Sequence, residues 1–124
     1  MYEWLAGNSY QMTVTLNATN MTLNSPASSY FKDVRWVMIG LDATQQKLAI
    51  KPIQKRDIDM NLVSMNRLQK ISIGKGYGRI TNKRMMQTIE DTLGCILTGQ
   101  KVYAEYNDKE DIMEIDLTDL VNED

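Results

Sequence analysis

Two stretches of alternating apolar and polar residues, at positions 37–50 and 102–115, constrain the fold of this chain more than any other feature. Alternation with a period of two is typical of a strand that buries one face. The two stretches match without a gap, and each has a polar turn at the same place. We therefore expect two equivalent β-hairpins. The coinciding apolar positions are Val37 with Val102, Leu48 with Met113, and Ile50 with Ile115.

Each predicted hairpin follows a short strand and a helix start. Residues 10–16 alternate as a half-buried strand, and Ser25, which precedes a proline, predicts the N-cap of a short helix. In the second half, either Thr81 or Asn82 is expected to cap a longer helix that ends at Gly94. Each half thus reads as strand, helix and hairpin.

The pattern predicts a single compact domain over residues 1–124 with a β-rich α+β fold. It comprises two related strand–helix–hairpin halves, 10–53 and 70–120, which pack as a pseudo-dimer and are joined by a connection over 54–69. The residues expected to face inward are Val14, Leu16, Val37, Ile39, Leu48, Ile50, Ile89, Leu93, Val102 and Ile115.

The chain has no histidine and one cysteine, Cys95. A Cys/His zinc site and Ser-His or Cys-His catalysis are therefore excluded, because no imidazole is present. The carboxylate pairs Asp57/Asp59 and Glu90/Asp91 lie in polar surroundings, and we interpret them as solvated surface. We expect a non-enzymatic protein without a metal or a small-molecule cofactor.

Composition predicts a globular protein, with 43% hydrophobic and 24% charged residues. No run approaches the roughly 20 apolar residues that a membrane span requires. The first residues lack the basic start and apolar centre of a secretory signal. The sequence therefore predicts a cytoplasmic protein without membrane contact.

Opposite charges gather in different parts of the chain. Between Lys47 and Arg84, ten Lys and Arg residues stand against two Asp, a local net charge of +8. From Lys101 to Asp124 the local net charge is −7. Such asymmetry is typical of a basic binding face beside an acidic one. The alternative is two solvated surfaces of opposite sign.

Three glycines surround Lys75 in the stretch from Gly74 to Gly78. Their spacing fits neither a P-loop nor a dinucleotide-binding turn, both of which lead from a strand into a helix. Two interpretations stay open. The glycines form a tight turn between two strands, or they let the backbone approach a polyanion while Arg79 grips a phosphate or a guanine edge.

Four short elements follow one another through the second half: Gly78-Arg79-Ile80-Thr81, a polar turn containing Lys83, Leu93-Gly94, and Gly99-Gln100-Lys101-Val102. Together they resemble the motif of the AbrB/MraZ superfamily of swapped-hairpin transcription factors, in which MraZ proteins carry two such units in one chain. The resemblance implies a DNA-binding regulator built as a pseudo-dimer. The chain is also similar to small proteins of Gram-positive mobile elements, and that resemblance implies no particular activity.

Two functions are therefore expected from different classes. The leading prediction is a non-enzymatic regulator that contacts duplex DNA through its basic, glycine-rich strand–helix segment. The alternative is a protein-interaction or structural module of a mobile element, which binds no nucleic acid and associates with itself or with a protein partner. The residues predicted to contact DNA are Lys75, Arg79, Lys83 and Arg84.

Overall fold

A computed structural model describes residues 1–2 and 11–121. Within these residues, eight antiparallel strands close into a barrel in the order β1-β2-β6-β5-β3-β4-β8-β7, and β7 pairs back onto β1. The strands are β1 (Thr13–Leu16), β2 (Asn20–Leu23), β3 (Trp36–Asp42), β4 (Lys47–Ile53), β5 (Leu68–Gly74), β6 (Tyr77–Thr81), β7 (Gln100–Asn107) and β8 (Ile112–Asp116). The helices are α1 (Ser25–Ser28), the 3-10 turn η2 (Ser29–Phe31), α2 (Lys55–Asp59), the 3-10 turn η3 (Met65–Arg67), α3 (Lys83–Leu93) and α4 (Thr118–Val121).

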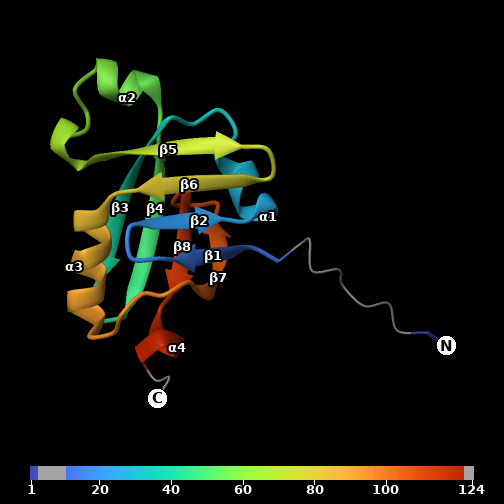
Figure 1. The fold of residues 1–124 in the computed structure, drawn as a ribbon. Helices are drawn as coiled ribbons and strands as arrows, with labels where there is room; N and C mark the ends of the chain where they lie inside the picture. Colours follow the sequence, from blue (N-terminus) through green and yellow to red (C-terminus); the bar gives the residue numbers. More distant parts are fainter. Residues whose placement is uncertain (3–10, 122–124) are drawn as a thin grey trace.

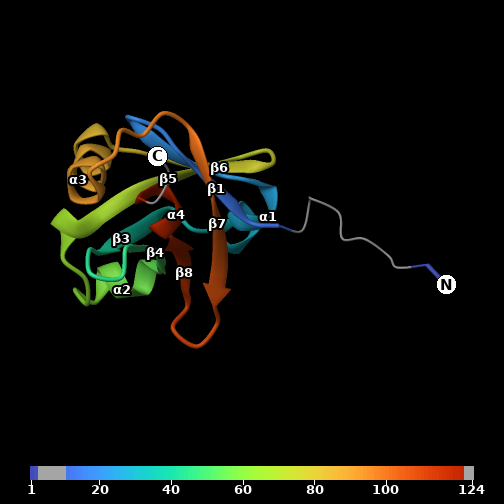
Figure 2. The same ribbon diagram turned by 90° about the horizontal axis from the view of Figure 1, so that it is seen from below.

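The barrel consists of two layers whose strands cross at a steep angle. Strands β1, β2, β6 and β5 form the layer nearest the viewer in Figure 1, and β3, β4, β7 and β8 lie behind it. Helices α1 and α3 lie at opposite ends of the near layer (Figure 1). The same elements lie at opposite sides of the barrel when it is seen from below (Figure 2).

The predicted fold class, an α+β pseudo-dimer of two strand–helix–hairpin halves, is wrong. The chain is one closed barrel, in which β2 pairs with β6, β4 with β8, β1 with β7 and β3 with β5. A hairpin alone presents two unpaired edges, and closure of the sheet removes every edge. Alternation along one strand shows which side chains face inward but not which distant strand lies alongside, so closure was missed.

The strand order nevertheless has an internal two-fold pattern. Exchanging β1–β4 with β5–β8 leaves the order of strands around the barrel unchanged. The register follows the same pattern at the β4–β8 seam, where Leu48 lies opposite Ile115 and Ile50 lies opposite Met113. These two contacts exchange with each other when the hairpins are exchanged, and Ala49 lies opposite its own equivalent, Glu114.

The hydrophobic core contains nearly all the residues predicted to face inward, including Ile89 and Leu93 of α3. Nine of the ten are buried, and Ile39 is half-buried. The pairing between β3 and β5 ends at Met38, so Ile39 has a neighbouring strand on one side only. The predicted first strand began at Tyr10, which lies outside the described residues, and β1 begins at Thr13.

An asparagine caps each of the two helices at the ends of the near layer. The expected N-cap at Ser25 is wrong, because Asn24 caps α1 and its Oδ1 accepts from the Ala27 amide at 3.2 Å. Asn82, one of the two predicted positions, caps α3. Gly94 ends α3 with a φ of 70°, as expected for a glycine C-cap.

Replacing Asn24 with alanine should lower the free energy of unfolding by about 2 kcal/mol, near the upper end for an N-cap. Asn24 also ties α1 to β1, since its Oδ1 accepts from the Thr13 amide at 3.1 Å and its Nδ2 donates to the Gln11 carbonyl at 2.7 Å. Urea unfolding measures the loss. Asn24→Asp keeps the accepting oxygen and should retain most of the stability. Equal midpoints for wild type and Asn24→Ala would contradict this role.

Candidate nucleic-acid interface

The glycine-rich stretch is the turn of the β5–β6 hairpin. Gly74 pairs with Tyr77, so Lys75 and Gly76 form a two-residue loop, and Gly76 has a φ of 84°. Side chains with a Cβ are strained at this φ, which accounts for a glycine there. Because the stretch joins two strands and does not lead into a helix, it lacks the geometry of a nucleotide-binding loop.

The flanking glycines leave room for neighbouring groups. The ring of Tyr77 lies against Gly74, where an added Cβ would overlap it. Gly78 lies beneath α1, and a Cβ there would be 3.0 Å from Ile73 Cδ1 and 3.4 Å from Ser28 Cβ. Packing and backbone conformation thus account for all three glycines. Any contact with a polyanion would therefore depend on the side chains around the turn.

The four predicted contact residues lie along a line and not in a cluster. Lys75 is at the tip of the β5–β6 turn, and Arg79 is on the outer face of β6. Lys83 and Arg84 form the start of α3, at the opposite end of β6 from the turn (Figure 1). At about 3.3 Å per residue, β6 alone separates the two ends by roughly 13 Å. All four side chains are exposed, and none forms an ion pair with a described residue.

Arg79 is partly held in place by its neighbours. Its Nε donates to Thr22 Oγ1 at 3.4 Å, and the guanidinium carbon lies 5.3 Å from the centre of the Tyr77 ring. The distance to the ring is within the range of a cation–π contact. These contacts orient the guanidinium, and its two terminal nitrogens make no hydrogen bond with a described residue. Two parallel donors of this kind match a phosphate or a guanine edge.

The start of α3 has a mixed electrostatic setting. Amide N–H groups at a helix N-terminus favour an anion, although the Asn82 side chain already accepts from the Met85 amide at 3.0 Å. Lys83 also lines a shallow pocket with Glu90 and Asp91 on the same helix. These carboxylates reduce the positive potential at Lys83. Arg84 does not line that pocket.

The acidic residues of the barrel strands are confined to one of the two layers. Strands β1, β2, β5 and β6 contain no Asp or Glu, and they carry the cations Lys70 and Arg79. The other layer contains the acids Asp42, Glu105, Glu114 and Asp116 together with the cations Lys47, Lys51 and Lys101. The acid-rich β7–β8 turn projects away from the β1-β2-β6 side of the barrel (Figure 2). The acidic C-terminal hairpin therefore lies mostly apart from the basic surface.

Strand register adds residues that reasoning from the sequence missed. Thr22 lies opposite Arg79, Thr15 opposite Thr22, and Lys101 opposite Thr15. None of the four is buried, and each has at least one buried neighbour next to it on its strand. We call Arg79, Thr22, Thr15 and Lys101 the outer row. Its members come from the β1–β2 hairpin, β6 and β7, which are distant from one another in the sequence, so only the pairing register could have revealed it.

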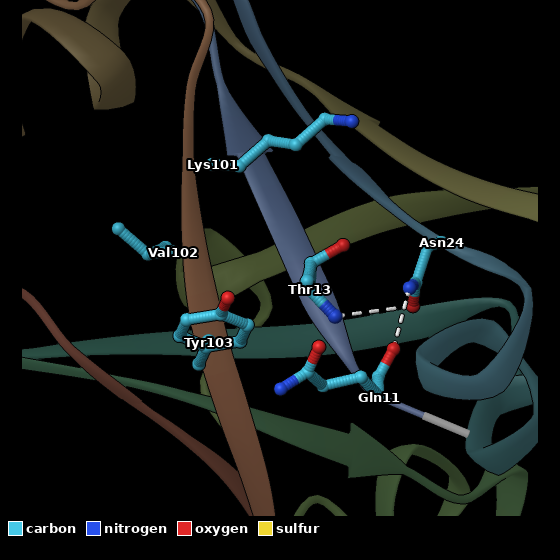
Figure 3. A pocket seen from close by; sticks show the side chains of 6 residues that line it. All are labelled: Gln11, Thr13, Asn24, Lys101, Val102 and Tyr103. Atoms are coloured by element: carbon cyan, nitrogen blue, oxygen red, sulfur yellow. Dashed lines mark hydrogen bonds between the residues drawn. The ribbon is translucent and has the colours of Figure 1, made fainter. Parts of the chain in front are cut away.

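A pocket of about 260 Å³ opens beside the outer row (Figure 3). The side chain of Lys101 extends across β1, and Val102 points to the opposite side of β7 (Figure 3). The lining is mostly polar and comes from the start of β1, the end of β2 and from β7. The lining residues are Gln11, Thr13, Asn24, Lys101, Val102 and Tyr103.

Cys95 and Asp57, two side chains with possible chemical roles, lie in settings that favour a structural role. Burial, and secondly the carboxylate of Glu90, raise the pKa of the Cys95 thiol. A thiol with a raised pKa is a poor nucleophile. Asp57 accepts from the Gln54 amide at 3.2 Å and completes the capping box of α2. Among the residues that the structure describes, no three His, Cys, Asp or Glu gather as metal ligands would.

Comparison of the chain with protein-family models, curated proteins and solved structures gave no significant match. No helix in the described part of the chain is long and apolar enough to cross a membrane. The proposed function therefore rests on the geometry and the charges of the chain itself.

Proposed function

We propose that the protein is a cytoplasmic, non-enzymatic regulator that binds duplex DNA along β6 and the start of α3. The observation that supports this most is the absence of acidic residues from strands β1, β2, β5 and β6, together with exposed cations that have no described ion-pair partner. A surface of this kind attracts phosphates, and its cations do not have to break an ion pair with a described residue before they bind one.

The four contact residues have different roles in the proposal. Arg79 is oriented by Thr22 and Tyr77 and presents two nitrogens to a base edge or a phosphate. Arg84 and Lys83 contact the sugar–phosphate backbone of the DNA where it passes the N-terminus of α3. Lys75 reaches another phosphate from the tip of the β5–β6 turn.

Binding to duplex DNA should weaken steeply with salt, because each bound phosphate releases counterions. If four cations each neutralise one phosphate, raising the salt from about 50 to about 200 mM should weaken binding about 150-fold. Fluorescence anisotropy with a labelled duplex at several salt concentrations measures the slope. Affinity that does not respond to salt, or the absence of duplex binding, would refute the proposal.

Substitution of Arg79 and Lys83 should separate the two kinds of contact. Arg79→Ala is expected to lower the binding free energy by about 1–3 kcal/mol and to relax the preference at one base position. Lys83→Ala should weaken binding to all DNA sequences alike and reduce the salt slope by about one. Arg79→Lys keeps the charge but loses the bidentate geometry. Lys109→Ala, in the distant β7–β8 turn, is the matched control and should bind as wild type does. The site is wrong if the folded double variant Arg79→Ala/Lys83→Ala keeps wild-type affinity.

One observation favours the alternative of a protein-interaction module. Met60, Leu62 and Met65 lie between β4 and β5 with 61%, 64% and 66% of their surface exposed. Beneath α2, a pocket of about 560 Å³ includes Trp36 and Ile58 among its lining residues. Exposed apolar groups of this size are typical of contact surfaces. Light scattering that shows association, abolished by Leu62→Ser, together with no binding to duplex DNA, would favour this alternative.

A further inference from the structure

The outer face of β6, β2, β1 and β7 combines two cations with two exposed aromatic rings. Arg79 and Lys101 end the outer row, and three strand spacings of about 4.8 Å put their backbones roughly 14 Å apart. Tyr77 and Tyr103 are the next outward residues on β6 and β7. Since β6 and β7 run in opposite directions, both tyrosines lie on the same side of the row. Each cation therefore has a tyrosine beside it.

One of the two rings on this face, Tyr103, is available for stacking, whereas the Tyr77 ring already packs against Gly74 and lies under the Arg79 guanidinium. Tyr77 is 40% exposed and Tyr103 is 63% exposed, and Tyr103 lies opposite Thr13 on β1. An aromatic ring that flanks a cation lets a base stack while its phosphate is neutralised, without selecting a sequence. The hydroxyls of Thr22 and Thr15 lie between the two ends and offer further hydrogen bonds to a sugar–phosphate backbone.

The pocket beside the row offers polar groups that the fold does not use. The side chains of Thr13, Lys101 and Tyr103 make no hydrogen bond with any residue in the described part of the chain. Asn24, by contrast, is fully engaged with Gln11 and the backbone (Figure 3). The unused hydroxyl and ammonium groups can bond to the edge of a base stacked on Tyr103.

The shape of this face favours a single strand over a duplex. Apart from the pocket, the strands of a small barrel curve around its axis, and a duplex is a stiff rod that would meet them along a narrow line. A single strand is flexible and can follow the curve from one end of the row to the other. The span of roughly 14 Å between Arg79 and Lys101 equals three strand spacings, which a few extended nucleotides can cover.

We propose that the outer face of β6, β2, β1 and β7 binds single-stranded nucleic acid. The phosphates lie on Arg79 and Lys101, and a base stacks on Tyr103. This goes beyond the duplex site along β6 and α3, with which it shares only Arg79. No carboxylate on β1, β2 or β6 opposes the strand, and the nearest acid on β7 is Glu105, two residues beyond Tyr103.

The test compares two labelled probes of equal charge by fluorescence anisotropy at low salt. One is an oligothymidylate of about eight nucleotides, within the usual length range of such sites. The other has the same backbone but no bases. The oligothymidylate should bind on the order of 10-fold more tightly, because only it can stack. Equal affinities, or no binding of the oligothymidylate, would overturn the proposal.

Variants at β7 locate the site without touching β6 or α3. Tyr103→Ala should remove most of the preference for the probe with bases, and Tyr103→Phe should keep it. Lys101→Ala should weaken the binding of both probes and lower the slope of log affinity against log salt concentration by about 0.7. Lys109→Ala is the control for charge. Unchanged binding of both probes to Lys101→Ala and Tyr103→Ala would refute the site.

The two proposals fail separately. Binding of the labelled duplex, unaffected by Lys101→Ala and Tyr103→Ala and without binding of the oligothymidylate, refutes the single-strand site and leaves the duplex site standing. If the oligothymidylate binds, its binding is lost on Tyr103→Ala and no duplex binds, the duplex site is refuted and the single-strand site stands. Circular dichroism of each variant confirms that it is folded, as expected for substitutions at exposed positions.

Discussion

Replacing Phe31 with alanine should lower the free energy of unfolding by about 3–5 kcal/mol, which is the range for a large aromatic side chain removed from a core. Phe31 ends the 3-10 turn after α1, is 0% exposed, and belongs to the main apolar cluster. Its removal leaves a cavity that the surrounding barrel residues cannot fill without moving the strands. Urea unfolding followed by far-UV circular dichroism measures the loss.

The adjacent Tyr30 is a matched control. Its ring is 46% exposed and stacks on Tyr106, with ring centres 4.1 Å apart. Tyr30→Ala should therefore cost only about 0.5–1.5 kcal/mol, the value of an aromatic pair. If the two variants lose similar stability, Phe31 does not fill the core in the way that its burial indicates.

Ile50→Ala should cost about 2–5 kcal/mol and should show coupling to a residue of the other hairpin. Ile50 is fully buried, and it lies opposite Met113 across the β4–β8 seam and opposite Ile39 within its own hairpin. A double-mutant cycle of Ile50→Ala with Met113→Ala measures the coupling energy between these two residues across the seam. Residues in contact are expected to couple by about 0.5–3 kcal/mol.

Ile39→Ala is the comparison for this prediction. Because Ile39 is half-buried, its replacement should lower the free energy of unfolding by less than that of Ile50. Additive losses for Ile50→Ala and Met113→Ala would contradict direct packing across the seam. The seam joins the two halves of the chain, so coupling there tests the closure of the barrel. It is independent of both binding proposals, which depend on exposed residues.

The candidate interface was only partly predictable from the sequence. Lys75, Arg79, Lys83 and Arg84 are exposed, and the basic stretch could be recognised from charge alone. The glycine pattern indicated a turn between strands, since a two-residue loop with a positive φ favours glycine. That Thr22 and Tyr77 orient Arg79 could not be predicted in full, because Thr22 lies 57 positions away in the sequence.

The sequence by itself determined which side chains are buried and where local elements end. Alternation with a period of two assigns each residue of a strand to one face, and local hydrogen bonds and backbone preferences place caps and turns. These are short-range effects, so they can be read from neighbouring residues. The exception is α1, where Asn24 and Ser25 are both suitable caps, and the hydrogen bond that Asn24 accepts from Thr13 on β1 favours the former.

Only the tertiary structure decided that the strands close into a barrel and which of them are neighbours. Pairing of β1 with β7 and of β4 with β8 joins residues far apart in the chain, and the energy of such contacts depends on register and on the removal of open edges. Alternation is the same whichever partner a strand takes. For this reason, the outer row that brings Arg79 and Lys101 onto one face follows from closure of the barrel and from no local pattern.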